Sequence, residues 1–577
     1  MKQLLKSKSF WIVTLLCLVT LFPFLGLTDY HTKGEPRESV VSYSILETGN
    51  WILSRNNGGE MAYKPPFFHW CIAAASIVRG AVTEGSSRVP SAAALTLMTI
   101  AGFLFYGRRK GVTVGVVASL VTFTSFELHR AGTNCRVDMV LTAMTVIAIY
   151  DLYKWYEQKM HGIPWLAILC MGLATMTKGP VGSIIPCLII GIFMLIRGVN
   201  FFKTFLTLAL FGLISLIFYG IWFYSAYKQG GHEFLFLMNE ENIGRMTNTM
   251  TYNSNVQPWP MNFVYIILGY IPWILIPIIG LFFLKKTSFV GIGKSFFGNE
   301  KWLRFKTMVR KTDDVDLYSV IALLTVLVFY CIPQSKRSVY LMPLYPFLGY
   351  FIAKMLLWIN DNKPAILRIY GGFLAVISSV LFLLIAVLQM NILPDTLLGG
   401  HKRHIIENVA TMQAFSGALC WWQYVIIIIT TAAGIYWWRW QKRTDIAKHL
   451  VYGLIGLTLA LYLSLDAVYS PLALNVKSQK PVAVQIDKLA PSSKGTLYEY
   501  IDAGVKAKGD PLHFFELNFY LGNRIGNFYR EHPKKGFLII PDGDFENLHT
   551  GFEKQGYKFK FIKSWPLFEY GLYSFSK

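Results

Sequence analysis

Charged residues stand at polar breaks in an otherwise apolar chain. Glu35, Arg37 and Lys64 lie in one polar stretch near the amino terminus, Asp138 begins an apolar run, and Lys178 separates two others. A charge at the mouth of a membrane span is costly and marks a functional site. Cations bind an anionic ligand, and a carboxylate among them can take a proton from an acceptor.

A polyprenyl-phosphate sugar fits this mixture of charges. Its phosphate is anionic, and its long tail needs a groove that faces lipid. Transfer of its sugar needs a carboxylate for the acceptor proton and cations for the charge that builds on the leaving phosphate. The residue types therefore favour sugar transfer at a membrane surface.

The elements that must position these groups are membrane helices. The chain has 577 residues, 54% of them hydrophobic and 15% charged. Apolar windows of roughly 17–25 residues, long enough to cross a bilayer as helix, recur to about residue 470. We expect an α-helical polytopic membrane protein with about 13 transmembrane helices. The expected spans are 9–28, 88–107, 111–127, 137–154, 162–177, 180–197, 202–226, 261–284, 316–333, 339–358, 367–390, 421–438 and 449–469.

Basic residues set the expected orientation. Lysines precede the first apolar run, so the amino terminus is expected in the cytoplasm, and the first helix is read as retained. With segment 66–83 lying along the outer surface, Arg108 to Lys110, Lys154 and Arg197 fall inside, as do the basic residues of 285–311 and 439–443. The carboxyl terminus then faces the periplasm, across a cell inner membrane.

The composition of the chain changes at about residue 471, after the last apolar run long enough to span. We expect a transmembrane domain over 1–470, with an extracytoplasmic first loop at 28–87, and a periplasmic α/β domain over 471–577. Val482 to Leu489 is typical of a short helix, and 496–501, 536–540 and 558–562 are typical of strands.

Cysteine and charge patterns exclude other classes. The seven cysteines have no metal-site spacing and no disulfide framework. The net charge of +22 fits inner-loop lysines and arginines and attraction to anionic membrane lipids, and no nucleic-acid motif accompanies it.

Ordered motifs give the chain a resemblance to a known family. They begin with Gly34-Glu35-Pro36-Arg37, Leu46 to Trp51, Tyr63 to Pro66 and Arg88 to Ala92. Asp138, Thr177 to Pro180, Glu241 to Arg245, Ser335 to Arg337, Tyr340 to Pro343 and Tyr345-Pro346 follow in the same order. Over about 1–360 the chain resembles the membrane-embedded GT-C glycosyltransferases of the protein O-mannosyltransferase group, especially the lipid A aminoarabinose transferases.

The resemblance implies roles for individual residues. The catalytic carboxylate would be Glu35, with Asp138 or Asp29 as the second. Two positions depart from the family, because Gly34 replaces its first acidic residue and Tyr63 replaces a glutamate. The base and a divalent metal cofactor are therefore left open. The donor phosphate would be bound by Lys64, Arg245, Lys336, Lys178 and Tyr345, with support from Arg37, Tyr63, Arg88 and Arg337.

Structural roles compete with these assignments. Glu35 and Arg37 can cap a helix start and pair with each other, and Asp138 can cap its own helix. Lys64 can be a solvated loop residue, and Lys178 can extend its ammonium to lipid headgroups.

The predicted function is an inverting glycosyltransferase that uses a polyprenyl (undecaprenyl) phosphate sugar donor. Its acceptor would be lipid A or another envelope glycolipid, with a glycan or a protein hydroxyl as alternatives. A transporter or flippase for lipid-linked sugars is the alternative from another class, although the charges gather at one face and no internal repeat is present. An inactive relative that binds the lipid-linked sugar is a further alternative.

Overall fold

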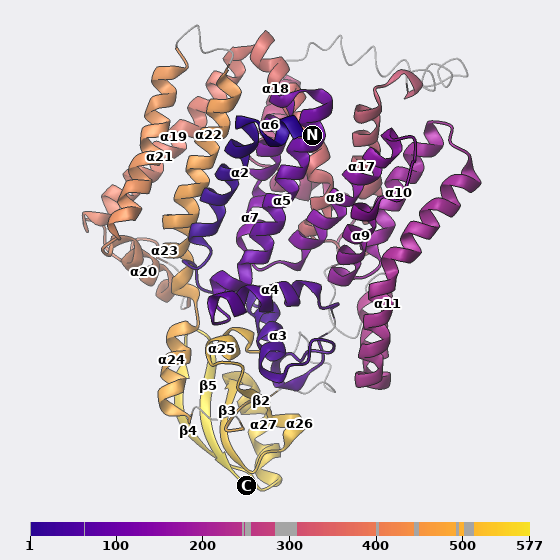
Figure 1. Cartoon of the computed structure of the whole chain (residues 1–577). Helices are drawn as coiled ribbons and strands as arrows, with labels where there is room; N and C mark the ends of the chain where they lie inside the picture. Colours follow the sequence, from indigo (N-terminus) through magenta and orange to yellow (C-terminus); the bar gives the residue numbers. More distant parts are fainter. Residues whose placement is uncertain are drawn as a thin grey trace.

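The computed structural model describes residues 2–62, 64–244, 247, 256–282, 309–399, 403–442, 449–491, 495–500 and 513–577. Long helices form a bundle, and a small sheet lies beyond one end of it (Figure 1). The amino terminus lies toward the opposite end (Figure 1). We call the two ends of the bundle the sheet end and the far end.

Helices occupy each of the 13 apolar segments that were expected to span. By length and composition, six helices of the described chain could cross a membrane, or up to eight if each of two bent pairs is one span. Four further apolar helices have 10–17 residues. The polytopic helical fold is confirmed, and the count of 13 spans stays a prediction.

The helices in the 13 apolar segments are α2 (Lys8–Leu21), α5 (Glu84–Lys110), α6 (Val112–Phe123), α8 (Val137–Glu157), α9 (Trp165–Lys178), α10 (Val181–Ile196), α11 (Phe201–Asn239), α13 (Met261–Gly269) with α14 (Leu275–Phe282), α17 (Asp314–Cys331), α18 (Tyr345–Asn362), α19 (Pro364–Gln389), α21 (Trp421–Trp440) and α22 (Leu450–Ser464).

Two shorter helices lie between the bundle and the sheet (Figure 1). They are α3 (Gly34–Thr48) and α4 (Phe67–Arg79). Helix α4 has 13 residues, about 20 Å of helix, whereas a bilayer core is about 30 Å thick. It is too short to cross the bilayer core by itself, and the surface position expected for 66–83 stays a prediction. Helix α3 ends at Gly49, whose φ of 68° suits glycine.

Small residues allow close contact between helices α9 and α10. A Cβ on Gly182 of α10 would lie 2.6 Å from the Cβ of Ala174 on α9. The α9–α10 hairpin therefore depends on glycine for its close packing. This packing fixes the end of α9, where Lys178 is the last residue.

The carboxyl-terminal region contains a five-stranded sheet in the order β2-β1-β3-β5-β4. Strand β1 (Leu497–Glu499) is parallel to β2 (Ile525–Asn527) and β3 (Lys535–Pro541), while β5 (Tyr570–Ser576) is antiparallel to β3 and β4 (Lys558–Trp565). Helices α24 (Lys480–Leu489), α25 (Phe515–Tyr520), α26 (Phe528–Glu531) and α27 (Asp542–Lys554) accompany it.

The predicted helix and three predicted strands of this region are confirmed. Strands β2 and β5 were not predicted. Strand β2 has three residues, too few for a period-two pattern, and glycine and serine in β5 weaken its strand propensity.

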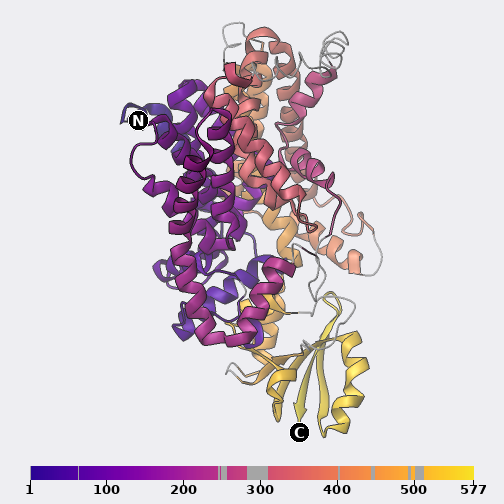
Figure 2. The same ribbon diagram turned by 90° about the vertical axis from the view of Figure 1, so that its right-hand side faces the viewer.

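The sheet region docks on the first loop, and a view turned by 90° keeps it beyond the same end of the bundle (Figure 2). The rings of Tyr30 and Phe519 lie 4.7 Å apart, and the Asn518 amide donates to Asn57 Oδ1 at 2.6 Å. The Lys480 ammonium donates to Asp29 Oδ1 at 2.8 Å. The first loop and the sheet region are therefore held together by specific contacts between described residues.

Candidate functional site

Glu35 in the first turn of α3 is completely enclosed by protein. Arg88 of α5 donates to both of its carboxylate oxygens, at 2.9 and 3.0 Å, and the backbone N–H of Cys135 donates at 2.7 Å. Burial raises the pKa of Glu35, but Arg88 outweighs that effect, and the pKa stays below its ordinary value. This geometry is typical of a buried ion pair that joins α3 to α5.

Glu38, one turn further along α3, is the centre of a second cluster. Its carboxylate accepts hydrogen bonds from the Lys64 ammonium, from Arg37 Nη2 at 3.0 Å and from His69 Nε2 at 2.9 Å. Only 5% of the Glu38 side chain is exposed, against 19% for Lys64. Burial raises the pKa of Glu38, but Lys64 and Arg37 hold it well below its usual range. Glu38 is therefore an ionised carboxylate shared by several donors.

Lys64 has an unusual pKa for a lysine. Burial lowers it to about 8, although the charges of Glu38 and Asp138 raise it in opposition. Because the charge of Asp138 acts on the pKa of Lys64, the start of α8 lies beside the loop that carries Lys64. Three segments, α3, the loop before α4, and α8, therefore converge at the sheet end of the bundle.

Asp138 and Lys178 form the ion pair next to Lys64. Asp138 lies in the first turn of α8, and the Lys178 ammonium donates to its Oδ1. The same ammonium lies 4.2 Å from the centre of the Tyr340 ring, a cation–π distance. About a quarter of the Lys178 side chain is exposed, so this lysine combines a fixed position with access from outside.

Arg136 occupies the space beside Gly34. A Cβ on Gly34 would lie 3.2 Å from Arg136 Nη1. The buried Arg136 Nε has no hydrogen-bond partner among the described residues. The guanidinium therefore stands where an acidic side chain at position 34 would begin.

Cations exceed carboxylates in this site. Five basic side chains lie around three carboxylates, an excess of two positive charges without counting His69. Such an excess in a partly enclosed site binds an anion such as a phosphate. The five cations are Arg37, Lys64, Arg88, Arg136 and Lys178, and the carboxylates are Glu35, Glu38 and Asp138.

The chain is similar to known glycosyltransferases in both sequence and fold. The family model described as dolichyl-phosphate-mannose-protein mannosyltransferase matches residues 63–223. An uncharacterized protein of Aquifex aeolicus is 27% identical over 248 residues, which are 41% of this chain and 48% of that protein. The undecaprenyl phosphate-alpha-4-amino-4-deoxy-L-arabinose arabinosyl transferase of Shewanella sediminis is 23% identical over 44% of this chain and 46% of its own length.

A solved structure covers almost the whole fold. The crystal structure of ArnT from Cupriavidus metallidurans bound to undecaprenyl phosphate has a TM-score of 0.70 and 15% identity, over 98% of each chain. The chain therefore has a fold similar to that of this ArnT over almost its whole length. It spans about half the length of these two curated relatives.

Three other residues predicted for the site, Lys336, Tyr345 and Arg337, have contacts different from those of the cluster described above. The buried Lys336 ammonium donates to the carbonyls of Cys331, at 3.0 Å, and of Pro333. Tyr345 is buried, and its hydroxyl donates to the Tyr265 carbonyl at 3.4 Å. Arg337 is exposed just before the 3-10 helix of 338–344.

Three further predicted residues are not placed in the cluster. Asp29 pairs with Lys480 of α24, on the side of the first loop that carries the sheet region. Tyr63 and Arg245 lie outside the described residues. Among described residues there is no group of three or more His, Cys, Asp or Glu side chains that could hold a metal ion.

Sequence reasoning assigned no role in the site to Glu38, His69 or Arg136. Glu38 carried a usable signal, because residues four apart share one face of a helix and Glu38 follows Gly34 by four. The positions of His69 and Arg136 depend on how α4 and α8 pack against α3. No local pattern contains that information.

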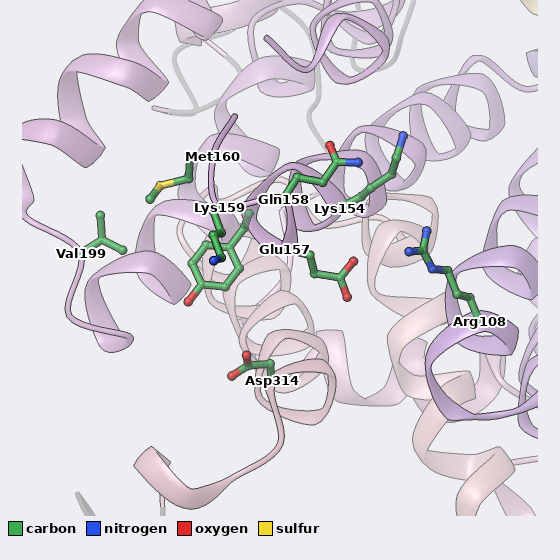
Figure 3. A pocket seen from close by; sticks show the side chains of 9 residues that line it. Arg108, Lys154, Glu157, Gln158, Lys159, Met160, Val199 and Asp314 are labelled. Atoms are coloured by element: carbon green, nitrogen blue, oxygen red, sulfur yellow. The ribbon is translucent and has the colours of Figure 1, made fainter. Parts of the chain in front are cut away.

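A pocket of about 580 Å³ lies at the far end of the bundle, away from this cluster. Side chains such as Arg108, Glu157 and Asp314 surround it (Figure 3). Asp138 and Glu157 are at opposite ends of α8, which separates the pocket from the candidate site by roughly 30 Å of helix. Of the residues predicted to bind the donor that the structure describes, none lines this pocket.

Basic residues predicted for the cytoplasmic side meet at the same far end. Arg109 donates to Glu157 at 2.7 Å, Lys110 to Asp313 at 2.5 Å, and Arg197 Nη2 lies 2.5 Å from Asp314 Oδ1. These contacts confirm that the three basic residues share one end of the bundle. That this end faces the cytoplasm stays a prediction.

Proposed function

We propose that this chain is an inverting glycosyltransferase that moves a sugar from an undecaprenyl-phosphate carrier to a phosphate of lipid A. The reaction takes place at the sheet end, which we assign to the periplasmic face of a cell inner membrane. The observation that carries the proposal is the cationic cluster of Lys64, Lys178 and their neighbours at this end of an ArnT-like bundle.

The donor phosphate would bind beside Lys64 and Lys178. Both lysines come from segments that converge at the sheet end, and each keeps part of its side chain exposed. Cations at this position stabilise the carrier phosphate as it leaves with the bonding electron pair. Arg136 supplies further positive charge next to Gly34.

The acceptor chemistry follows from how the carboxylates are engaged. Glu35 is paired with Arg88, Glu38 with Lys64, and Asp138 with Lys178. An acceptor phosphate is already ionised near neutral pH and needs little help from a base. Its oxygen attacks the anomeric carbon, the bond from that carbon to the carrier phosphate breaks, and the configuration inverts. Of the carboxylates predicted to be catalytic, Asp138 has the best position to orient this step.

The basic far-end pairs and the sheet region support the proposed topology. Loops rich in lysine and arginine stay in the cytoplasm, and the far end contains Arg109, Lys110 and Arg197. The sheet region over 471–577 would then be a periplasmic domain, and the amino terminus would be cytoplasmic. An enzyme accounts better than a transporter for charges gathered at one end of the bundle.

Mass spectrometry of lipid A and of the undecaprenyl-phosphate pool tests the proposal. Cells with and without the protein are compared with cells that carry Lys64→Ala. We expect lipid A to lose a glycosyl group and the lipid-linked sugar to accumulate in the deletion, with the variant matching it. The matched control is the same substitution at an exposed lysine far along the chain on α11, Lys203→Ala.

Other outcomes identify other functions. Unchanged lipid A with an accumulated donor would move the acceptor to a protein hydroxyl or another glycan. No change in either pool would contradict glycosyl transfer and favour a transporter or an inactive relative.

A further inference from the structure

We propose that Glu38 is a positioning residue, which holds the Lys64 ammonium in place and keeps it positively charged for the donor phosphate. The inference rests on the proposed function for the identity of the ligand. It concerns a residue that neither the motifs nor the comparisons assign.

The geometry of Glu38 allows it to act on Lys64 but not directly on substrate. Its side chain is almost completely buried, while that of Lys64 reaches the surface. One carboxylate oxygen accepts from Lys64 and Arg37, and the other accepts from His69. Glu38 therefore lies behind the lysine and anchors it to α3 and α4.

Buried His69 makes the anchor rigid. It is 1% exposed on the inner face of α4, and its Nε2 lies 2.9 Å from Glu38 Oε2. Ser42, one turn after Glu38 on α3, donates to the His69 carbonyl at 3.2 Å. The carboxylate cannot change rotamer without breaking contacts between two helices.

The charge on Lys64 depends on its neighbours. Burial alone favours the neutral amine, and among the described residues the charged groups that act on the lysine include Glu38 and Arg37 from α3 and Asp138 from α8. Glu38 is the strongest of these in favouring the ammonium form, and Asp138 is weaker. With Glu38 in place, the pKa of Lys64 is about 8, close to neutral pH. Without it, a larger share of the lysine would be neutral near pH 7, and its attraction for phosphate would weaken.

The first test measures Lys64 itself in the full-length protein, without any substrate. An amine-reactive label is applied in short pulses from pH 6 to 10, and the modification of Lys64 is quantified by mass spectrometry. We expect the reactivity midpoint near pH 8 in the native protein, and at least about one pH unit lower in Glu38→Gln. Glu38→Asp, which keeps the charge, should stay within about half a unit of native. An unchanged midpoint in Glu38→Gln would overturn the proposal.

The second test measures binding of undecaprenyl phosphate to the protein in nanodiscs between pH 7 and 9.5. The native affinity should fall as the pH passes about 8, whereas Glu38→Gln, with a midpoint about one unit lower, should bind about twofold more weakly at pH 7 and about tenfold more weakly at pH 9.5. Lys64→Arg combined with Glu38→Gln should bind with no pH dependence in this range, because a guanidinium does not titrate there. A pH dependence that survives in the double variant would overturn the proposal.

The two tests separate this inference from the proposed function. If the native protein does not bind the carrier but the Lys64 midpoint moves in Glu38→Gln, the proposed donor is wrong and the action of Glu38 on Lys64 stands. If the carrier binds and the midpoint does not move, the donor stands and the role of Glu38 is wrong. Size-exclusion profiles of each variant show whether it is folded.

Discussion

Arg88 donates to both carboxylate oxygens of Glu35, at 2.9 and 3.0 Å, across 53 residues of sequence. The remaining guanidinium nitrogen donates to the carbonyls of Leu25 and Thr28, at 2.8 and 2.6 Å. One buried side chain therefore joins α5, α3 and the segment before α3. This arrangement favours a structural role for Glu35, and the catalytic role expected from the sequence stays a prediction.

The first prediction concerns this ion pair. Arg88→Ala leaves a buried carboxylate without its partner, which costs about 3–5 kcal/mol of stability. We expect a clear loss of thermal stability in detergent, measured by the midpoint of unfolding. Arg88→Lys should recover only part of it, because an ammonium cannot reproduce the paired geometry. An Arg88→Ala protein that is as stable as native but inactive would instead support a direct role for this pair at the substrate.

The sequence predicted the parts of this site that follow from motif order and loop charge, but not the contacts that depend on how helices pack. Motif order and the positive-inside rule correctly indicated a polytopic helical fold and gathered Arg88, Asp138 and Lys178 on one side of it. They could not indicate that Arg88 pairs with Glu35, because that contact is set by the packing of α3 against α5. Nor could they indicate that Asp29 lies apart from the site, because it pairs with Lys480 about 450 residues later.

The second prediction tests the acceptor chemistry. If the acceptor is an ionised phosphate, Asp138→Asn removes no proton acceptor, and transfer should slow by less than about tenfold. A general base contributes about 10²–10⁴-fold. The measurement is the transfer rate at saturating donor, with lipid A as acceptor. A loss of 100-fold or more would show that Asp138 takes a proton and that the acceptor is a hydroxyl.

The third prediction uses the contact between the first loop and the sheet region. His513 lies 3.3 Å from Glu499 and 3.4 Å from Glu60, and these carboxylates raise its pKa from 6.5 to about 9 against the effect of burial. The folded protein therefore binds a proton that the unfolded chain releases above pH 6.5. The stabilisation is complete below pH 6.5 and is lost as the pH rises through 9, up to about 3 kcal/mol.

His513→Gln should remove this part of the pH dependence. Thermal unfolding is followed from pH 6 to 9.5 in the native protein and the variant. The native midpoint should fall over this range more than the midpoint of His513→Gln. His161→Gln, at an exposed position of the far end, serves as the control and should behave as native. Parallel curves for all three proteins would contradict the assignment.

The fourth prediction concerns Glu516 on α25. Burial raises its pKa to about 8, although the backbone N–H of Gln479 donates to it at 2.5 Å. The folded state holds this carboxyl neutral while the unfolded chain ionises above pH 4.5, so its contribution to stability declines as the pH rises from 4.5 to 8. Glu516→Gln keeps the shape and cannot ionise, so it should be more stable than native at pH 8 and nearly equal at pH 4.5. A variant less stable than native at pH 8 would contradict this account.

The fifth prediction places a carboxylate at Gly34. The position lies in the first turn of α3, where an acid is favourable, and a new side chain would begin 3.2 Å from Arg136 Nη1. Gly34→Asp should therefore fold, and its charge would cancel part of the excess that attracts an anionic acceptor. We expect transfer to a phosphate acceptor to fall by about tenfold, which corresponds to about 1.4 kcal/mol. Gly34→Asn has nearly the same size without the charge, so it should lose much less. If both variants lose activity equally, the cause is crowding against Arg136, and the charge balance of the site does not decide which acceptor is used.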